Sequence, residues 1–417
     1  MKTLYGLPEK VEYCSRCVIS NQRPSSIIEQ KHTIDSKKKI IQFVDGVCDA
    51  CRVSNAKENT DWVAREKQLR EICDKHRSKS GEYDCIVPGS GGKDSVMQAH
   101  ILKYKYGMNP LTVTWAPHLY TDWGFRNFEA WVNSGFDNVK ITPNGKVHRL
   151  LTRLAFDKLL HPFQPFIIGQ RHVATKLAVK MNIPLIFYGE SGSDYGNPLK
   201  ENDMATRSFQ DYEFFDQTDL SNVYLSGISL EELISDYGIG LNDFSMYLPP
   251  DPNKVIEKKI EVHWLGYYMK WHPQGAYYYA SNNTNFVAAP ERTVGTYSTY
   301  NSIDDKMDDF HFYTTYIKFG IGRASYDASQ EIRNGEIDRE EGIMLVNKYD
   351  GEYPARFMNE ICDYLTIDQK TYGDLRTKFK VPDFTSEYFD KHIDKFRSPH
   401  LWQKNSSGHW ELRHKIK

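Results

Sequence analysis

The residues best suited to chemistry form one short polar loop, Gly89-Ser-Gly-Gly-Lys-Asp-Ser95. It follows an apolar stretch that predicts a strand over residues 83–87, and it leads into a predicted helix over residues 95–106. Small residues let backbone N–H groups approach phosphate oxygens closely, and a helix start carries partial positive charge. Lys93 adds a mobile cation. The loop therefore predicts a site for the phosphates of a nucleotide.

The loop differs from the Walker A motif. Val87 stands where that motif needs its first glycine, and Asp94 follows the lysine where it needs Ser or Thr. A plain Gly- and Ser-rich turn at a helix start is the simpler alternative. The order of strand, loop and helix favours the phosphate site.

Four cysteines form two Cys-x-x-Cys pairs, Cys14 with Cys17 and Cys48 with Cys51. Their spacing is typical of a closed tetrahedral zinc site, which stabilises a fold and leaves no position open for catalysis. A strand predicted over residues 37–44 leads into the second pair, as in a zinc ribbon. Disulfides and a redox or iron–sulfur centre are the alternatives. The other cysteines are isolated and the first residues do not resemble a secretory signal, so structural zinc is favoured.

Composition bounds the class of protein. The 417 residues predict two or three domains, and the net charge is −2 with 26% charged residues. No apolar run approaches the ~18–20 residues that cross a bilayer, so we expect a soluble, cytoplasmic protein without a membrane partner. The near-neutral balance argues against a nucleic-acid partner, because such binding needs a basic surplus.

Short apolar segments alternate with helical patterns along the middle of the chain, which predicts a parallel sheet in a doubly wound α/β fold. Ligands of such sheets bind at the carboxyl ends of the strands. The predicted organisation is a zinc-ribbon segment, a nucleotide domain and a mostly helical C-terminal region that contributes to the substrate site, over residues 1–60, 61–250 and 251–417. Strands of the sheet are predicted at residues 83–87, 110–116, 138–142 and 183–188, and a further strand-like segment lies at residues 262–268. Helices are predicted at 61–76, 95–106, 122–134, 147–160, 169–181, 302–319, 328–334, 338–348, 354–364, 367–379 and 386–396.

Several further segments, together with the loop and the cysteines, carry a resemblance. They are Thr114-Trp-Ala-Pro117, Tyr120-Thr-Asp-Trp123, Gln164-Pro-Phe-Ile-Ile-Gly-Gln170, Phe187-Tyr-Gly-Glu190, Pro290-Glu-Arg-Thr293 and Ile317-Lys-Phe-Gly-Ile-Gly-Arg-Ala324. From Tyr13 to about Asp350 the chain resembles the N-acetyl sugar amidotransferases of surface-polysaccharide biosynthesis. That family belongs to the ATP pyrophosphatase (PP-loop) superfamily, whose fold is of the adenine nucleotide alpha hydrolase type. Ser90-Gly-Gly-Lys-Asp-Ser95 alone indicates only the superfamily.

The resemblance implies an enzyme that converts the acetamido group of a sugar into an acetamidino group through an adenylated imidate. The pathways implied are those of O-antigen (lipopolysaccharide), capsule or flagellin glycans, including pseudaminic and legionaminic acids. ATP and Mg²⁺ are the implied cofactors besides Zn²⁺. The implied phosphate ligands are Ser90, Gly91, Gly92, Lys93, Asp94 and Ser95, with Lys93 and Asp94 also catalytic and with Trp115 and Gly189 near the adenosine.

No glutaminase motif accompanies these residues. None of the cysteines lies in a Gly-x-Cys-x-Gly elbow, and residue 2 is Lys rather than the Cys of the other glutaminase type. We therefore expect ammonia to arrive free or from a separate glutaminase subunit.

Other polar residues carry two interpretations each. Glu190 and Asp194 follow the fourth predicted strand and could bind Mg²⁺ or accept a proton, with Glu190 the stronger catalytic candidate; ordinary loop carboxylates are the alternative. Asp122 could contact the substrate or cap a helix. Arg292 and Arg323 could bind a substrate carboxylate or phosphate, or form buried ion pairs.

The remaining candidates have weaker signals. The Asp304-Asp-Lys306 run fits either helix capping or an active-site role. His118 and His172 lie in suitable segments, although lone histidines are more often structural.

Two other classes of function remain open. A tRNA-modifying relative, either a thiolase or a lysidine-type ligase, can share the loop and the cysteine pairs, but no cysteine lies between Cys85 and Cys362 to carry sulfur. The other is a non-catalytic zinc-ribbon interaction protein, which the intact loop disfavours.

Overall fold

The computed structural model describes residues 2–24, 41–189, 221, 223–379 and 381–417. Its centre is a five-stranded, all-parallel sheet in the order β5-β4-β3-β6-β9. The strands are β3 (Cys85–Pro88), β4 (Pro110–Trp115), β5 (Asn138–Ile141), β6 (Leu185–Tyr188) and β9 (Glu261–Trp264). The parallel sheet predicted from the alternating pattern is confirmed, and all four predicted strands belong to it.

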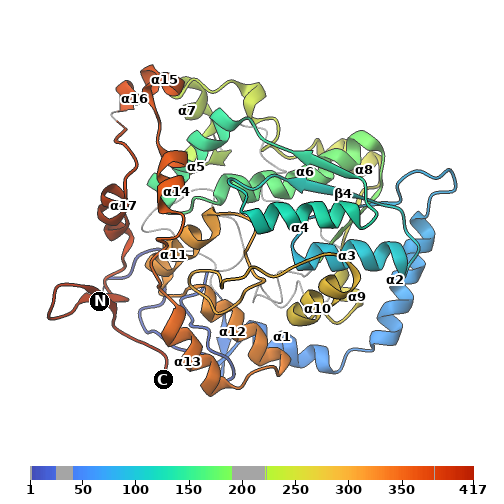
Figure 1. Cartoon of the computed structure of the whole chain (residues 1–417), viewed down its shortest axis with the longest axis horizontal. Helices are drawn as coiled ribbons and strands as arrows, with labels where there is room; N and C mark the ends of the chain where they lie inside the picture. Colours follow the sequence, from blue (N-terminus) through green and yellow to red (C-terminus); the bar gives the residue numbers. More distant parts are fainter. Residues whose placement is uncertain (1, 25–40, 190–220, 222, 380) are drawn as a thin grey trace.

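Helices cover both faces of the sheet (Figure 1). In the central strands β3 and β6, alternate side chains enter two separate apolar clusters, as Ile86 and Val87 show. The first face is covered by α5 (Gly145–Leu159) and α6 (Gln164–Met181). The second is covered by α2 (Trp62–His76), α3 (Lys93–Tyr104), α4 (Asp122–Asn133), α9 (Leu265–Tyr268) and α10 (Pro273–Asn283). This double covering explains why β3 and β6 are apolar throughout, whereas β4, β5 and β9 alternate apolar and polar residues.

The fifth strand lies beyond the predicted domain boundary near residue 250. β9 pairs with β6 in register, from Leu185 with Glu261 to Tyr188 with Trp264. The sheet therefore extends into the region that the sequence pattern had assigned to the helical part. Between these strands, the described elements are β7 (Tyr224–Leu225), β8 (Ile228–Ser229), α7 (Leu230–Ser235), η5 (Leu241–Phe244) and α8 (Pro252–Glu257).

A mostly helical region follows α10, as expected. Its helix α11 (Met307–Phe319) begins five residues later than predicted, because Ser302 has a φ of +53°, which a helix does not allow. The helix predicted over residues 367–379 is divided at Gly373. The other elements are α12 (Arg323–Asn334), α13 (Arg339–Tyr349), α14 (Met358–Leu365), α15 (Gln369–Tyr372), α16 (Asp374–Phe379), α17 (Ser386–Ile393), η6 (Asp394–Phe396) and an unpredicted hairpin, β10 (Trp402–Lys404) and β11 (Trp410–Leu412).

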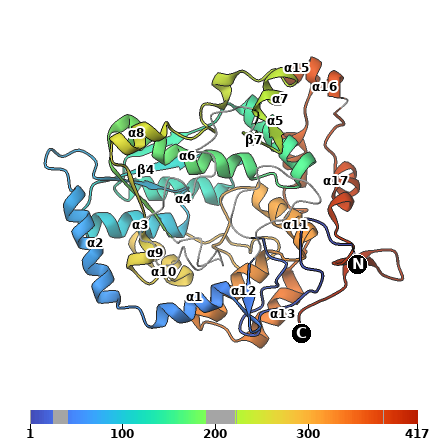
Figure 2. The ribbon, with the colours of Figure 1, turned by 180° about the vertical axis from the view of Figure 1, so that it is seen from behind.

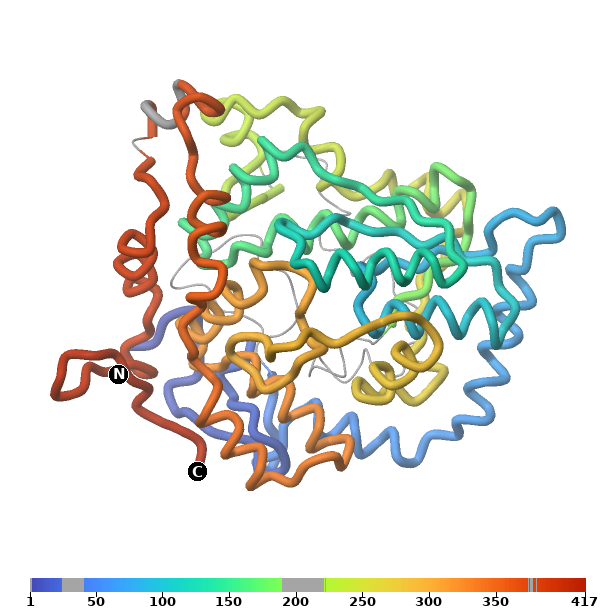
Figure 3. The backbone as a smooth tube through the Cα atoms, viewed as in Figure 1, coloured from blue at the N-terminus to red at the C-terminus, as the bar shows by residue number. Residues whose placement is uncertain are grey.

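The first residues of the chain pack against the last helices, and the two ends lie close together in both ribbon views (Figures 1 and 2). The Leu4 N–H donates to Ser398 Oγ at 2.9 Å, and the Tyr5 hydroxyl donates to the Phe396 carbonyl at 2.9 Å. The cysteine segment continues with β1 (Phe43–Val44), β2 (Val47–Cys48) and α1 (Asp49–Glu58). In the backbone trace, α1 and α2 run along the edge of the molecule and link this segment to the sheet (Figure 3).

No helix among the described residues is both long enough and apolar enough to span a bilayer.

Candidate active site

The polar loop connects β3 to α3, and two of its glycines are required by its shape. Gly91 has a φ of +91°, and a Cβ there would lie 2.6 Å from Phe128 Cα. A Cβ on Gly89 would lie 2.2 Å from Ser95 Cβ. Helix α3 begins at Lys93, two residues earlier than predicted, so the helix start with its free N–H groups lies within the loop.

Lys93 and Asp94 form the charged part of the loop. The Lys93 side chain is 8% exposed, and its Nζ lies 2.6 Å from Asp94 Oδ2. The other oxygen, Asp94 Oδ1, is buried and has no hydrogen-bond partner among the described residues. Ser95 Oγ donates to the Gly92 carbonyl at 2.9 Å, which fixes the turn. The loop therefore presents a buried cation and one unsatisfied carboxylate oxygen.

Two cavities meet at this loop, and both are lined by Asp94, Gln170, Arg323 and Gln330. The smaller, about 310 Å³, lies directly over Ser90, Gly92 and Lys93. The larger, about 720 Å³, extends past the ends of β3 and β6 to Gln98, Tyr188, Gly189 and Trp264. The strand order changes direction between β3 and β6, which is where open parallel sheets bind nucleotides.

Helix α11 brings carboxylates to the smaller cavity. Asp304 and Asp308 line it, and burial raises the pKa of both side chains. Asp305 Oδ1 accepts the Met307 N–H at 2.9 Å, but the N-cap residue of α11 is Lys306, which makes no side-chain cap hydrogen bond. Its Oδ2 accepts the His118 N–H at 2.7 Å, which ties α11 to the segment that follows β4. Acids separated from the loop by more than 200 residues thus face it.

The two arginines predicted from the sequence have different surroundings. Arg323 begins α12 and lines both cavities, with its Nε donating to Asp327 Oδ1 at 2.9 Å. Arg292 makes a two-point ion pair with Glu352, with both N–O distances at 2.6 Å, and this lowers the pKa of Glu352. It lines neither of the two cavities.

Other predicted residues lie away from the cavities. Trp115 is buried in the core, where a Cβ on Gly169 would lie 2.3 Å from its ring. Asp122 is exposed in the first turn of α4, and the helix cap is its neighbour Thr121, whose Oγ1 accepts the Gly124 N–H at 2.9 Å. The interpretation of Asp122 as the cap is therefore wrong.

The two candidate histidines are buried and make hydrogen bonds within the protein interior. The His118 side chain is buried, and its Nδ1 lies 2.8 Å from Asp305 Oδ2. His172 Nδ1 lies 2.7 Å from the Tyr247 carbonyl. Glu190 and Asp194 lie outside the described residues, as does the first half of the strand predicted over residues 37–44, whose end is β1.

The cysteine pairs come together as predicted. The four thiol sulfurs lie within 4.8 Å of one another and are buried, and the Cys17–Cys48 sulfurs are 3.7 Å apart. Thiolates ~2.3 Å from a tetrahedral zinc ion lie about 3.8 Å from each other, so the donors fit zinc. The Cys48 N–H also points at Cys14 Sγ, at 3.4 Å, which is a common way to stabilise a ligating thiolate.

Sequence reasoning missed several residues of the cavity walls. Gln98 lies one helical turn after the loop, and its Nε2 donates to the Phe187 carbonyl at 2.5 Å. Gln170 lies within a quoted motif, so its signal was available. The others carried no local signal because they come from distant elements; they are Arg23, Arg171, Trp264 and Gln330.

Comparison with known proteins adds two findings. Residues 291–417 match the family described as "LPS biosynthesis protein WbpG-like, C-terminal domain". This match supports a biosynthetic enzyme with a role in lipopolysaccharide or glycan synthesis, and it extends to residue 417, beyond the end of the motif resemblance near Asp350.

The second match is shorter. The chain is 35% identical over 82 residues to an uncharacterized protein of Methanocaldococcus jannaschii. The match covers 20% of this chain and 29% of that protein, so the chain spans less than a third of the length of this relative.

Proposed function

We propose that this protein is an ATP-dependent amidotransferase of the PP-loop type that converts the acetamido group of a sugar into an acetamidino group. One observation carries the proposal. The glycine loop shares its cavities with Asp304, Asp308 and Arg323, which belong to the region matched by the glycan-biosynthesis domain. A phosphate site and a glycan-related region thus form one reaction chamber.

The chemistry requires activation of a poor electrophile. An amide carbonyl resists ammonia because nitrogen donates into it, and its oxygen is a poor leaving group. In the proposal, the amide oxygen attacks the α-phosphorus of ATP and the bond to the bridging oxygen breaks, releasing diphosphate. Ammonia then adds to the imidate carbon and AMP leaves with the former amide oxygen. The two protons that ammonia loses go to diphosphate and the amidine.

The residues of the loop supply positioning and electrostatics for these steps. Lys93 and the N–H groups at the start of α3 would face the β and γ phosphates, where negative charge accumulates as diphosphate departs. Burial of Lys93 strengthens this effect because fewer water molecules screen its charge. Tyr188 and Gly189, at the end of β6, line the part of the larger cavity that would take the adenosine.

The smaller cavity also suits a magnesium ion. Mg²⁺ prefers oxygen ligands, and Asp94, Asp304 and Asp308 line this cavity together. Asp94 Oδ1 is the oxygen without a partner among the described residues. When bound, the ion would neutralise the phosphates, and these carboxylates would hold it.

A product assay tests the proposal. The protein is incubated with ATP, Mg²⁺, ammonium chloride and a panel of acetamido sugars and nucleotide sugars, and with tRNA in a parallel arm. We expect AMP and diphosphate in equal amounts, and a sugar product lighter by the difference between O and NH. Formation of ADP and phosphate, or AMP formation with tRNA alone, would contradict it.

The source of ammonia is tested with the same assay. We propose a separate glutaminase subunit, because the sequence has no glutaminase motif. Ammonium should support turnover by the purified chain while glutamine should not. Equal turnover with glutamine would show that the chain contains a glutaminase of its own.

A further inference from the structure

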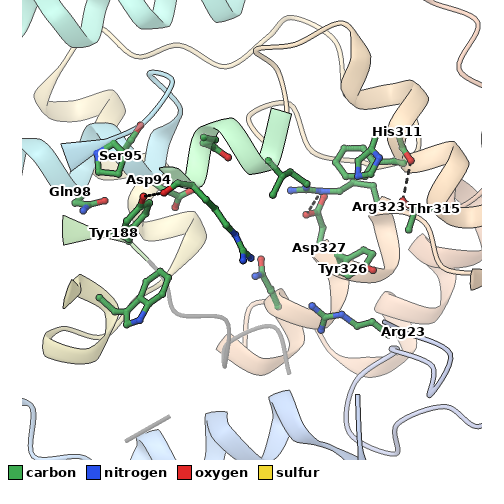
Figure 4. A pocket seen from close by; sticks show the side chains of 18 residues that line it. Arg23, Asp94, Ser95, Gln98, Tyr188, His311, Thr315, Arg323, Tyr326 and Asp327 are labelled. Atoms are coloured by element: carbon green, nitrogen blue, oxygen red, sulfur yellow. Dashed lines mark hydrogen bonds and ion pairs between the residues drawn. The ribbon is translucent and has the colours of Figure 1, made fainter. Parts of the chain in front are cut away.

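Helix α11 and the short segment before it, residues 303–306, lie against the glycine loop. Figure 4 shows Asp94 of the loop on one side of the larger cavity and His311 of α11 on the opposite side. At the start of the helix, the Ser90 hydroxyl donates a hydrogen bond to the Asp304 carboxylate, which acts against the rise in pKa that burial causes there. The segment before α11 is thus in direct contact with the loop.

This segment is fastened to the chain that follows β4. Residues 119–121 pair with residues 304–306 through two backbone hydrogen bonds, of 2.9 and 3.2 Å. The Thr121 hydroxyl also donates to the Ile303 carbonyl. A Cβ on Gly124 would lie 2.4 Å from the backbone of the segment, so glycine is what permits this close approach.

A buried carboxylate joins the two chains from inside. Asp305 is 5% exposed, and its Oδ2 accepts hydrogen bonds from the backbone N–H and Nδ1 of His118, at 2.7 and 2.8 Å. Its Oδ1 accepts the N–H groups of Leu119 and Met307, at 3.2 and 2.9 Å. An ionised carboxylate only accepts hydrogen bonds, so Nδ1 is the ring nitrogen of His118 that carries a hydrogen in this contact.

Aromatic neighbours hold the His118 ring in this orientation. The side chain is buried, and its ring stacks with those of His148 and Phe166, with both centroid distances at 5.0 Å. The ring of Phe163 meets it edge-on at 4.7 Å. His118 is not among the described residues that line either cavity, so it can act on the site only through Asp305.

The contacts form one continuous path from His118 to the glycine loop. It runs from the ring to Asp305, along the backbone to Asp304 and from that carboxylate to Ser90. We infer that His118 and Asp305 are positioning residues for the nucleotide site, because they hold Asp304 where it fixes the Ser90 hydroxyl. This inference rests on the proposed function, since it takes the loop to bind ATP. A loop that is held in its binding shape loses less freedom when the nucleotide binds.

Calorimetric titration with a nucleotide analogue tests the inference without turnover. The probe is α,β-methylene-ATP with excess Mg²⁺, titrated into the whole protein. His118→Leu removes the ring hydrogen bond to Asp305, so we expect the Kd for the analogue to rise about tenfold, the equivalent of one hydrogen bond to a charged group. His118→Asn keeps an N–H near the position of Nδ1, so its Kd should stay within about twofold of the wild-type value.

His263→Leu is the matched control. His263 is also buried and also pairs with a carboxylate, that of Glu261 at 3.1 Å, but it belongs to β9 and is not among the described residues that line the cavities. Its loss should lower the midpoint of thermal unfolding, as His118→Leu does, and leave the Kd unchanged. A purely structural role for His118 would make the two variants alike.

A double-mutant cycle shows whether the effect passes through the loop. Ser90→Ala removes the hydroxyl that contacts Asp304, so adding His118→Leu to it should cause no further loss of affinity. Where His118→Leu does not fold, Thr121→Val takes its place, because it removes the bond to the Ile303 carbonyl in the same junction. Thr121→Ser keeps that hydroxyl and is its conservative companion.

Three results would overturn the inference. They are an unchanged Kd in the folded His118→Leu or Thr121→Val variant, an equal loss of affinity in His263→Leu, and additive effects of Ser90→Ala and His118→Leu. AMP formation in the product assay is scored separately. Nucleotide binding that the variants do not alter defeats only the inference, whereas nucleotide binding without AMP formation on any sugar defeats only the proposed reaction.

Discussion

The glycine loop and the arginines that line the larger cavity, Arg23, Arg171 and Arg323, belong to one chamber, yet the chain builds them in different ways. The loop is a single run of seven residues between β3 and α3. The arginines come from the cysteine segment, from α6 and from α12, and they meet only in the folded protein. The loop can thus be recognised from one local run of residues, whereas the group of arginines depends on tertiary structure.

Of the substitutions proposed here, one in the glycine loop should have the largest effect on activity. Lys93→Met keeps the volume of the buried stem but removes the cation, so we expect kcat for AMP formation to fall about 10²- to 10³-fold. The control is Lys105→Met, because Lys105 is 51% exposed and its ion pair with Glu66 lies at the surface. Steady-state AMP release measures both. A wild-type kcat in the Lys93→Met enzyme would show that the lysine of the loop does not contribute to the reaction.

Among the arginines, Arg323 lines the cavities and Arg292 does not, so variants of the two can be compared directly. Arg323→Met should raise the KM for a charged acceptor about 10- to 100-fold and leave the KM for ATP nearly unchanged. Arg292→Met should instead reduce the free energy of unfolding by about 1 kcal/mol, since its pair with Glu352 is about one-third exposed. Steady-state kinetics and urea denaturation of both variants separate substrate binding from a structural role. Equal acceptor KM values in the two variants would contradict a binding role for Arg323 alone.

Loss of the metal should leave the glycine loop intact. Cys48→Ser removes one of four ligands, so we expect loss of zinc, measured by elemental analysis, with ATP binding kept. Cys362→Ser is the control, because this cysteine lies apart from the cluster. A zinc-loaded Cys48→Ser protein would contradict the ligand assignment.

The last effect concerns stability alone and its dependence on pH, and it involves helix α11. Burial raises the pKa of Asp309 on α11 to about 6. The folded state then holds a proton that the unfolded state loses near pH 4, so stability falls as pH rises from about 4 through 6. Asp309→Asn should remove this slope and gain on the order of 1–3 kcal/mol at pH 8 relative to pH 5. Denaturation at both pH values measures it; an unchanged slope would assign the pH dependence to other groups.

Prediction from sequence succeeded where residues close in the chain determine the structure. The loop, the cysteine cluster and four strands depend on local pattern, and each was placed correctly. The strand-like segment predicted over residues 262–268 overlaps β9, but its place in the sheet was not predicted because its partner β6 lies more than 70 residues away in the chain. Trp115, expected near adenosine from its place at a strand end, is a core residue because Gly169 leaves room for its ring.

The arginines of the larger cavity could not be predicted as a group for a related reason. Arg23 has no motif around it, and its position becomes meaningful only through contact with Tyr326, about 300 residues later. Arg292 and Arg323 carried equal signals in the sequence, and each pairs with a carboxylate in the structure, Glu352 and Asp327 respectively. What separates them is that Arg323 also lines the two cavities and Arg292 does not. Charge alone does not show which partner an arginine finds.

The contact between Leu4 and Ser398 has a consequence for how the protein is made. During translation the opening segment emerges first, but the surface that receives it exists only after residue 398 has left the ribosome. The cysteine segment must therefore wait, undocked, through most of synthesis. We expect the four thiols to capture an ion during that interval, so that metal binding precedes docking of the segment onto the rest of the protein.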